Sequence, residues 1–134
     1  MNSSGPANSF AQVAQGTVLP PLRLIVSAAA NERYWRAAGV SHPSLVAGAL
    51  YPPVAANLAV LCFGQVCGDA MIQTRQRLVC HRSAMAGVEL LIAGVVSARY
   101  EKRGRTYVDV ETRVSTADGV LWESEVSFTP AATL

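Results

Sequence analysis

The feature that most constrains the fold of this chain is a long stretch without charge. No Asp, Glu, Lys or Arg occurs from residue 37 to residue 68, and residues 45–67 are the most uniformly apolar part of the chain. Pro52 and Pro53 can begin a helix but cannot lie inside one, because proline lacks the amide hydrogen and its ring clashes with the preceding turn. We therefore predict a helix over residues 53–67 with apolar side chains on every face.

A helix that is apolar on every face is surrounded either by protein or by lipid. At about 1.5 Å per residue, residues 53–67 span roughly 22 Å, which is short of the ~30 Å hydrocarbon core of a bilayer. The stretch also contains Asn57, Gly64 and Gln65. We favour a buried central helix over a membrane span, and such a helix in a small domain needs a curved sheet around it.

Length and composition indicate a single cytoplasmic domain. The chain has 134 residues and a net charge of +2, and its basic residues are scattered except for a cluster at residues 102–105. We therefore expect no nucleic acid partner. The three cysteines indicate buried free thiols in a reducing compartment, and no metal or other cofactor is expected. The polar N-terminal residues carry no secretory signal, so we expect a cytoplasmic protein without a membrane partner.

The N-terminal third predicts a leader, an edge strand and a helix. Residues 1–16 are rich in small polar side chains, and we expect a disordered or loosely docked leader there. Residues 18–26 alternate in hydropathy and contain two adjacent prolines, which places this strand at a sheet edge. Ser27 then caps a helix that ends at Gly39.

The rest of the chain predicts a sheet. Residues 39–51 have the small residues of a loop but several apolar ones, which favours a loop over a cavity or an interface. Beyond residue 69, runs of alternating side chains predict strands over 71–80, 88–101, 106–116 and 120–128. We expect one α+β domain over residues 17–134, in which a curved antiparallel β-sheet wraps around the central apolar helix.

A helix enclosed by a long antiparallel meander is the hotdog architecture, and this sequence resembles the MaoC-like branch of that fold. The resemblance covers residues 18–128 in element order and includes the phrases ERYWRAAG, HRSAMAGVELLIAGVV and DGVLWESEVSF. That branch holds (R)-specific enoyl-thioester hydratases and 3-hydroxyacyl-thioester dehydratases. The resemblance implies a hotdog fold and, as ligand, an acyl thioester of coenzyme A or of an acyl carrier protein.

The loop after the first helix departs from the pattern of active members. They carry a Gly-Asp-x-Asn-Pro-x-His run, and here the run is Gly-Val-Ser-His-Pro-Ser-Leu at residues 39–45. Val40 stands at the position of the catalytic aspartate, and Leu45 at that of the catalytic histidine. Hydration of an enoyl thioester needs one group to activate water and one to handle the α-carbon proton, and neither side chain can do so. The resemblance therefore implies that the family's catalytic pair is absent.

The favoured interpretation of this loss is a substrate-binding subunit. Its acyl tunnel would be shaped by Val40, Leu45, Val54 and Ala55, while a sister hotdog chain supplies the catalytic pair. Because a single hotdog sheet has an exposed edge, we expect a homodimer or a heterodimer with a second hotdog chain.

Two enzymatic alternatives and one non-enzymatic one stay open. The chain could be a self-sufficient hydratase or dehydratase in which His42 is the base and Ser41 or Tyr51 its hydrogen-bonding partner. It could be an acyl thioesterase, although residues 37–68 lack the required carboxylate unless Glu32 turns inward. It could also be an acyl-binding or assembly protein without activity, because a fold alone fixes no function.

Three further groups could contact a thioester. His81 and Arg82, at the end of a predicted strand, have a structural role or hold a phosphate of coenzyme A. The basic hairpin at residues 102–105 is a solvated turn or attracts phosphates and an acidic carrier protein. Free backbone amides near Val54 at the start of the central helix could polarise a thioester carbonyl, although the prolines remove donors there.

Overall fold

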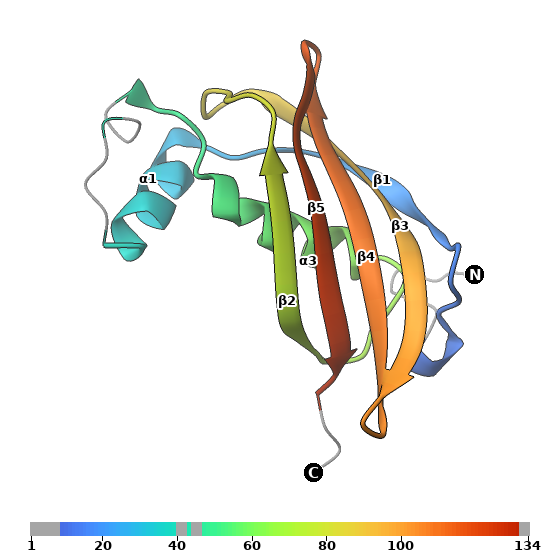
Figure 1. The fold of residues 1–134 in the computed structure, drawn as a ribbon. Helices are drawn as coiled ribbons and strands as arrows, with labels where there is room; N and C mark the ends of the chain where they lie inside the picture. The colour runs from blue at the N-terminus through green and yellow to red at the C-terminus, as the bar shows by residue number, and fades with distance from the viewer. Residues whose placement is uncertain (1–8, 40–42, 44–46, 132–134) are drawn as a thin grey trace.

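The structure, a computed structural model, describes residues 9–39, 43 and 47–131 (Figure 1). Five antiparallel strands form one sheet in the order β1-β3-β4-β5-β2. The strands are β1 Val18–Ile25, β2 Met71–Cys80, β3 Glu89–Lys102, β4 Arg105–Thr116 and β5 Gly119–Pro130. The helices are α1 Ala28–Ala37 and α3 Ala55–Phe63, and 3₁₀ turns occur at η1 Phe10–Gln12 and η2 Pro52–Val54. The predicted α+β class, with a curved antiparallel sheet against a central helix, is confirmed.

The two faces of the sheet differ because side chains alternate along each strand. Val110 of β4 pairs with Val126 of β5, and both are fully buried on the α3 side. Their neighbours Glu111 and Glu125 pair with each other on the opposite face. At the β4–β5 turn Gly119 has φ +127°, a conformation that favours glycine over residues with a Cβ. The sheet therefore has a dry inner face, which contacts α3, and a charged outer face.

Helix α3 crosses behind the sheet in Figure 1 and packs on it through one side. Ala59 and Phe63 are fully buried, and the Phe63 ring stacks on Phe128 with centroids 5.3 Å apart. On the side away from the sheet, Val60 and Leu61 are 41% and 55% exposed. The prediction that protein surrounds this helix on every face is not met by this chain alone, because one sheet covers only one side of a helix.

The two prolines lie where the sequence predicts, at the start of the helical segment. Pro52 and Pro53 form η2, and α3 follows from Ala55 to Phe63, so it begins two residues later and ends four residues earlier than expected. Residues 64–66 continue as turns. Within the part of the chain that the structure describes, no helix has the length and apolar character needed to cross a membrane.

The segment before β1 packs on the domain, which differs from the expected leader. Phe10 and Val13 are buried in the core. The Phe10 amide donates to Asp69 Oδ2 at 2.7 Å, and the Arg99 guanidinium donates to the carbonyls of Phe10 and Val13 at 2.9 Å each. These buried side chains and hydrogen bonds dock residues 9–16, while residues 1–8 lie outside the described residues.

Candidate functional site

Helix α1 and the chain entering α3 are joined by two side chains one helical turn apart. Ser27 caps α1 as predicted, and Asn31 and Trp35 then lie on the same face. Both donate to the Ala49 carbonyl at 2.8 Å, from Asn31 Nδ2 and Trp35 Nε1. Asn31 Oδ1 also accepts from the Tyr51 amide at 2.9 Å. Asn31 is 3% exposed, so these bonds satisfy a buried amide and fix the base of the loop.

Tyr51, a predicted catalytic partner, lies in an aromatic cluster at this junction. Its ring contacts Trp35 edge-on at 4.9 Å and lies parallel to Tyr34 at 6.5 Å. The Tyr34 hydroxyl accepts from Asn57 Nδ2 of α3 at 3.5 Å. Tyr51 is therefore held in place next to the start of α3, where the predicted acyl site begins.

The described end of the loop is attached to the connection between β2 and β3. The Leu50 amide donates to the Ala84 carbonyl at 2.9 Å, and the Ala86 amide donates to the Gly48 carbonyl at 3.0 Å. Gly48 has φ +80°, and a Cβ there would lie 3.0 Å from the Met85 methyl carbon. Glycine is therefore required at this close approach.

Four predicted site residues lie outside the described residues, so their roles stay predictions. They are Val40, Ser41, His42 and Leu45. Gly39 and Pro43, which belong to the same run, are described, and both are exposed.

Val54 and Ala55 lie at the start of α3, as expected, but their amides are not free. The Val54 amide donates to the Tyr51 carbonyl at 3.1 Å, and the Ala55 amide donates to the carbonyls of Pro52 and Pro53. The expectation that free amides of residues 54–56 polarise a thioester carbonyl is therefore wrong for Val54 and Ala55. Val54 and Ala55 are 3% and 0% exposed, so in this chain alone they belong to the buried core.

His81 and Arg82 lie where β2 ends against β5, and neither is arranged around an anion site. His81 Nε2 is 3.4 Å from Glu123 Oε1. The Arg82 guanidinium donates to the Asp118 carbonyl in the β4–β5 turn. Because each contacts an acceptor or a carboxylate, the geometry favours their structural role over binding of a phosphate.

Two other candidate groups lie away from the start of α3. Glu32 forms an exposed ion pair with Arg36 on α1 at 3.4 Å, and it does not turn toward the central helix. The basic hairpin joins β3 to β4, at the opposite end of the sheet from the β4–β5 turn (Figure 1). Neither arrangement supports chemistry at the α1–α3 junction.

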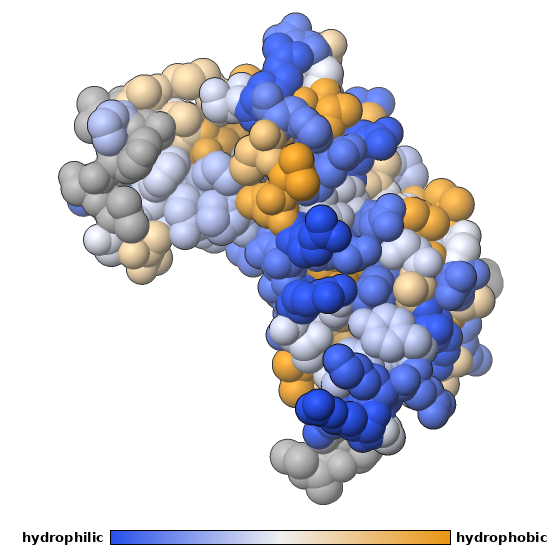
Figure 2. Space-filling view, in the orientation of Figure 1, coloured by the Kyte–Doolittle hydropathy of each residue, from blue (hydrophilic) through white to orange (hydrophobic). Residues whose placement is uncertain are grey.

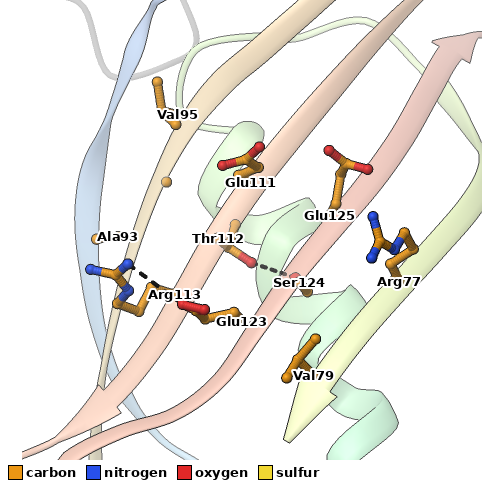
Figure 3. Close-up of a pocket in the computed structure, with 11 residues that line it drawn as sticks. Arg77, Val79, Ala93, Val95, Glu111, Thr112, Arg113, Glu123, Ser124 and Glu125 are labelled. Atoms are coloured by element: carbon orange, nitrogen blue, oxygen red, sulfur yellow. Dashed lines mark hydrogen bonds and ion pairs between the residues drawn. The ribbon is translucent and has the colours of Figure 1, made fainter.

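A hollow lies on the outer face of the sheet (Figure 3). It has a volume of about 460 Å³ and crosses β2, β5, β4 and β3. Its charged groups pair across strands, as in the Arg113–Glu123 contact at 3.5 Å. The hydrogen bond of 2.6 Å between Thr112 and Ser124 closes its floor. This open, charged hollow does not suit an acyl chain, which requires an apolar cavity.

A buried polar cluster on the outer face had no signal in the sequence pattern. Asp109 is 8% exposed and its Oδ1 accepts from Ser127 Oγ at 2.6 Å and from the Tyr100 hydroxyl at 3.1 Å. Burial, together with the bond to Asp109, raises the pKa of Tyr100. Ser127 is 2% exposed, so the cluster holds strands together and does not offer a nucleophile.

The thiols and acids do not form a metal site. Burial raises the pKa of the Cys62 and Cys67 thiols, which keeps both protonated and unreactive. Among the described residues, no group of three His, Cys, Asp or Glu side chains could hold a metal ion.

Comparison of the whole fold with solved structures identifies its class. The chain is similar to a chain of the HadBC (3R-hydroxyacyl-ACP dehydratase) complex from Mycobacterium tuberculosis, with a TM-score of 0.73 and 20% identity over 86% of this chain and 96% of that one. It is similar to the ChsH1-ChsH2 complex from the same organism, with a TM-score of 0.69 and 15% identity over 89% and 99%.

A third similar structure is the MaoC-like dehydratase from Rhodospirillum rubrum, with a TM-score of 0.66 and 18% identity over 92% of this chain and 97% of that one. No family model matches this sequence, and no curated protein matches it. The chain therefore has the hotdog fold of the MaoC-like dehydratases, which confirms the resemblance at the level of the fold.

Proposed function

We propose that this chain is the substrate-binding subunit of an acyl-thioester hydratase or dehydratase and that it works with a catalytic hotdog chain. One observation carries the proposal. Val40 and Leu45 stand at the positions of the catalytic pair, in a chain that otherwise has the elements of the fold. A chain of this kind can shape an acyl site but lacks the groups that activate water and move the α-carbon proton.

The surface of the chain supports a partner. Val60 and Leu61 leave an apolar side of α3 uncovered. Figure 2 shows α1 standing out from the sheet on the β2 side, and the outline of the molecule is hollowed between them. A second hotdog chain packed on Val60 and Leu61 would cover α3 on the side that its own sheet leaves open. Two of the similar structures are themselves complexes, HadBC and ChsH1-ChsH2.

The ligand of this site is an acyl thioester of coenzyme A or of an acyl carrier protein. Its acyl chain would lie between the loop that carries Val40 and Leu45 and the buried start of α3 at Val54 and Ala55. The charge-free composition of residues 37–68 suits an acyl chain, because a buried charge without a partner is costly. A thioesterase is disfavoured, since Glu32 is ion-paired on the surface of α1.

Binding of a medium-chain acyl-coenzyme A, measured by titration calorimetry, tests this proposal. We expect saturable binding that strengthens with acyl length, and binding of free coenzyme A that is weaker. Leu45→Glu should weaken acyl binding about tenfold or more, because it places a charge in the acyl site. The neighbouring Ser44→Glu is the matched control and should bind normally. An affinity that does not depend on acyl length, or an equal loss of affinity in both variants, would contradict the proposal.

A further inference from the structure

The two edges of the sheet are protected to different degrees. Strand β1 contains Pro20 and Pro21, which lack amide donors, and its register with β3 shifts between Leu19 and Leu22. The Gln65 side chain also donates to the Pro20 carbonyl. Strand β2 has no proline, and residues 75–80 pair with β5 without interruption. Among the described residues β2 has β5 as its one strand neighbour, so its other edge is open.

The outer face of this open edge is basic. Arg75, Arg77 and Val79 alternate on it, and all three are exposed. Arg75 forms an ion pair with Glu125 of β5 at 3.5 Å, whereas Arg77 has no ion pair within the described residues. A strand added to β2 would therefore meet two arginines in succession.

A second copy of this chain would bring the same two arginines to the contact. Two copies joined through β2 form a two-fold symmetric antiparallel pair, in which outer-face residues lie opposite outer-face residues. A pairing centred on Gln76 places Arg75 opposite Arg77 twice. One centred on Arg77 places that residue opposite itself, and one centred on Leu78 leaves the two Arg77 side chains diagonal. Like charges in these positions are destabilising.

We infer that the open edge of β2 selects a different chain, whose edge strand carries Asp or Glu on its outer face, over a second copy of itself. The inference rests on the proposed function, and it specifies the partner that function requires. Carboxylates opposite Arg75 and Arg77 would form cross-strand pairs, and an apolar residue would suit Val79, which is 48% exposed. In Figure 2 hydrophilic side chains dominate this face, with a hydrophobic patch near the upper end of β2.

Charge reversal on this edge tests the inference without knowledge of the natural partner. The double variant Arg75→Glu/Arg77→Glu supplies an acidic edge on the same fold. Sedimentation velocity at low ionic strength should show monomers for the wild-type chain alone and for the variant alone, and a dimer when they are mixed. The mixed pair should associate about tenfold or more tightly than either chain with itself, and high salt should weaken it.

The matched control carries the same change of charge at a distant site. Lys102→Glu/Arg105→Glu alters the β3–β4 turn and should not associate with the wild-type chain. Circular dichroism checks that each variant folds. If the acidic double variant does not fold, Arg75→Gln/Arg77→Gln is used in its place, because it removes the two like charges without adding acidic ones.

Either of two results would overturn the inference. One is a wild-type chain that dimerises with itself at low ionic strength, and the other is a mixed pair that stays monomeric. Failure of the proposed function can be told apart from failure of this inference, because the function is measured by thioester binding and turnover, whereas the inference is measured by association in sedimentation velocity.

Discussion

The two edges of the sheet differ in how far contacts within the chain occupy them. At the β1 side the Gln65 side chain occupies the Pro20 carbonyl, and the Gly16 amide extends the pairing with β3 by donating to the Val96 carbonyl at 2.8 Å. At the β2 side the sheet ends, because β2 pairs with β5 and no strand of the described residues lies on its other side, and α1 stands out beyond it (Figure 1). Contacts within the chain therefore occupy part of one edge, and the other is the edge that we propose for a partner.

The largest expected difference is between a buried residue of β1 and an exposed residue of β2. Leu19 of β1 is 1% exposed, and Ile72 of β2 is 46% exposed. Leu19→Ala leaves a cavity and should lower the free energy of unfolding by about 2–5 kcal/mol. Ile72→Ala should change it by about 0.5 kcal/mol or less. Urea unfolding gives both values. Equal losses would show that Ile72 is packed as tightly as Leu19.

The buried Cys62 and the exposed Cys80 should differ in their reactivity. Cys80 is exposed at the end of β2, while Cys62 is buried with its sulfur 3.6 Å from the Pro20 carbonyl oxygen. Burial raises the pKa of Cys62, so it reacts only after local opening. A thiol reagent should modify Cys80 about a hundredfold faster than Cys62, as measured by mass spectrometry of peptides. Similar rates would mean that the β1 edge opens readily.

A smaller effect is expected from the side chain that closes β1. Gln65→Ala removes the donor to the Pro20 carbonyl and should cost about 0.5–1.5 kcal/mol of unfolding free energy. Gln73→Ala, at an exposed position on β2, is the matched control and should be neutral. If the two variants lose the same stability, the glutamine does not close the edge.

The smallest effect on stability is expected from a substitution of Gln76 in β2. Gln76 Nε2 is buried and has no hydrogen-bond partner among the described residues. Replacing this amide by an apolar side chain of similar length removes an unsatisfied donor, so Gln76→Met should leave stability within about 0.5 kcal/mol or raise it slightly. A thermal melt measures the change. A loss above about 1.5 kcal/mol would show that the amide has a partner in solution.

The order of elements and the edge position of β1 could be predicted from the sequence, because prolines, caps and alternating side chains act locally. The docking of residues 9–16 could not, since the partners Asp69 and Arg99 lie far along the chain. The one-sided burial of α3 could not either, because an apolar face does not show whether its cover belongs to the same chain. The absence of the catalytic pair is what the resemblance implies, and it stays a prediction together with the roles of residues 40–42 and 45.

The hydrogen bonds that anchor the loop could be predicted only in part from the sequence. Asn31 and Trp35 are spaced for one face of a helix, yet nothing in the sequence identifies the Ala49 carbonyl as their shared acceptor. Asp109 was likewise one polar residue in an alternating strand until the fold placed it beside Ser127 and Tyr100.

Hydration of a short enoyl-coenzyme A by the purified chain, beside its His42→Ala variant, tests the central claim most directly. A substrate-binding subunit without the catalytic pair should show saturable acyl-thioester binding and no turnover in either protein. Turnover by the chain alone that disappears in His42→Ala would contradict this account, and it would identify a self-sufficient enzyme whose base is His42, with Ser41 or Tyr51 as its partner.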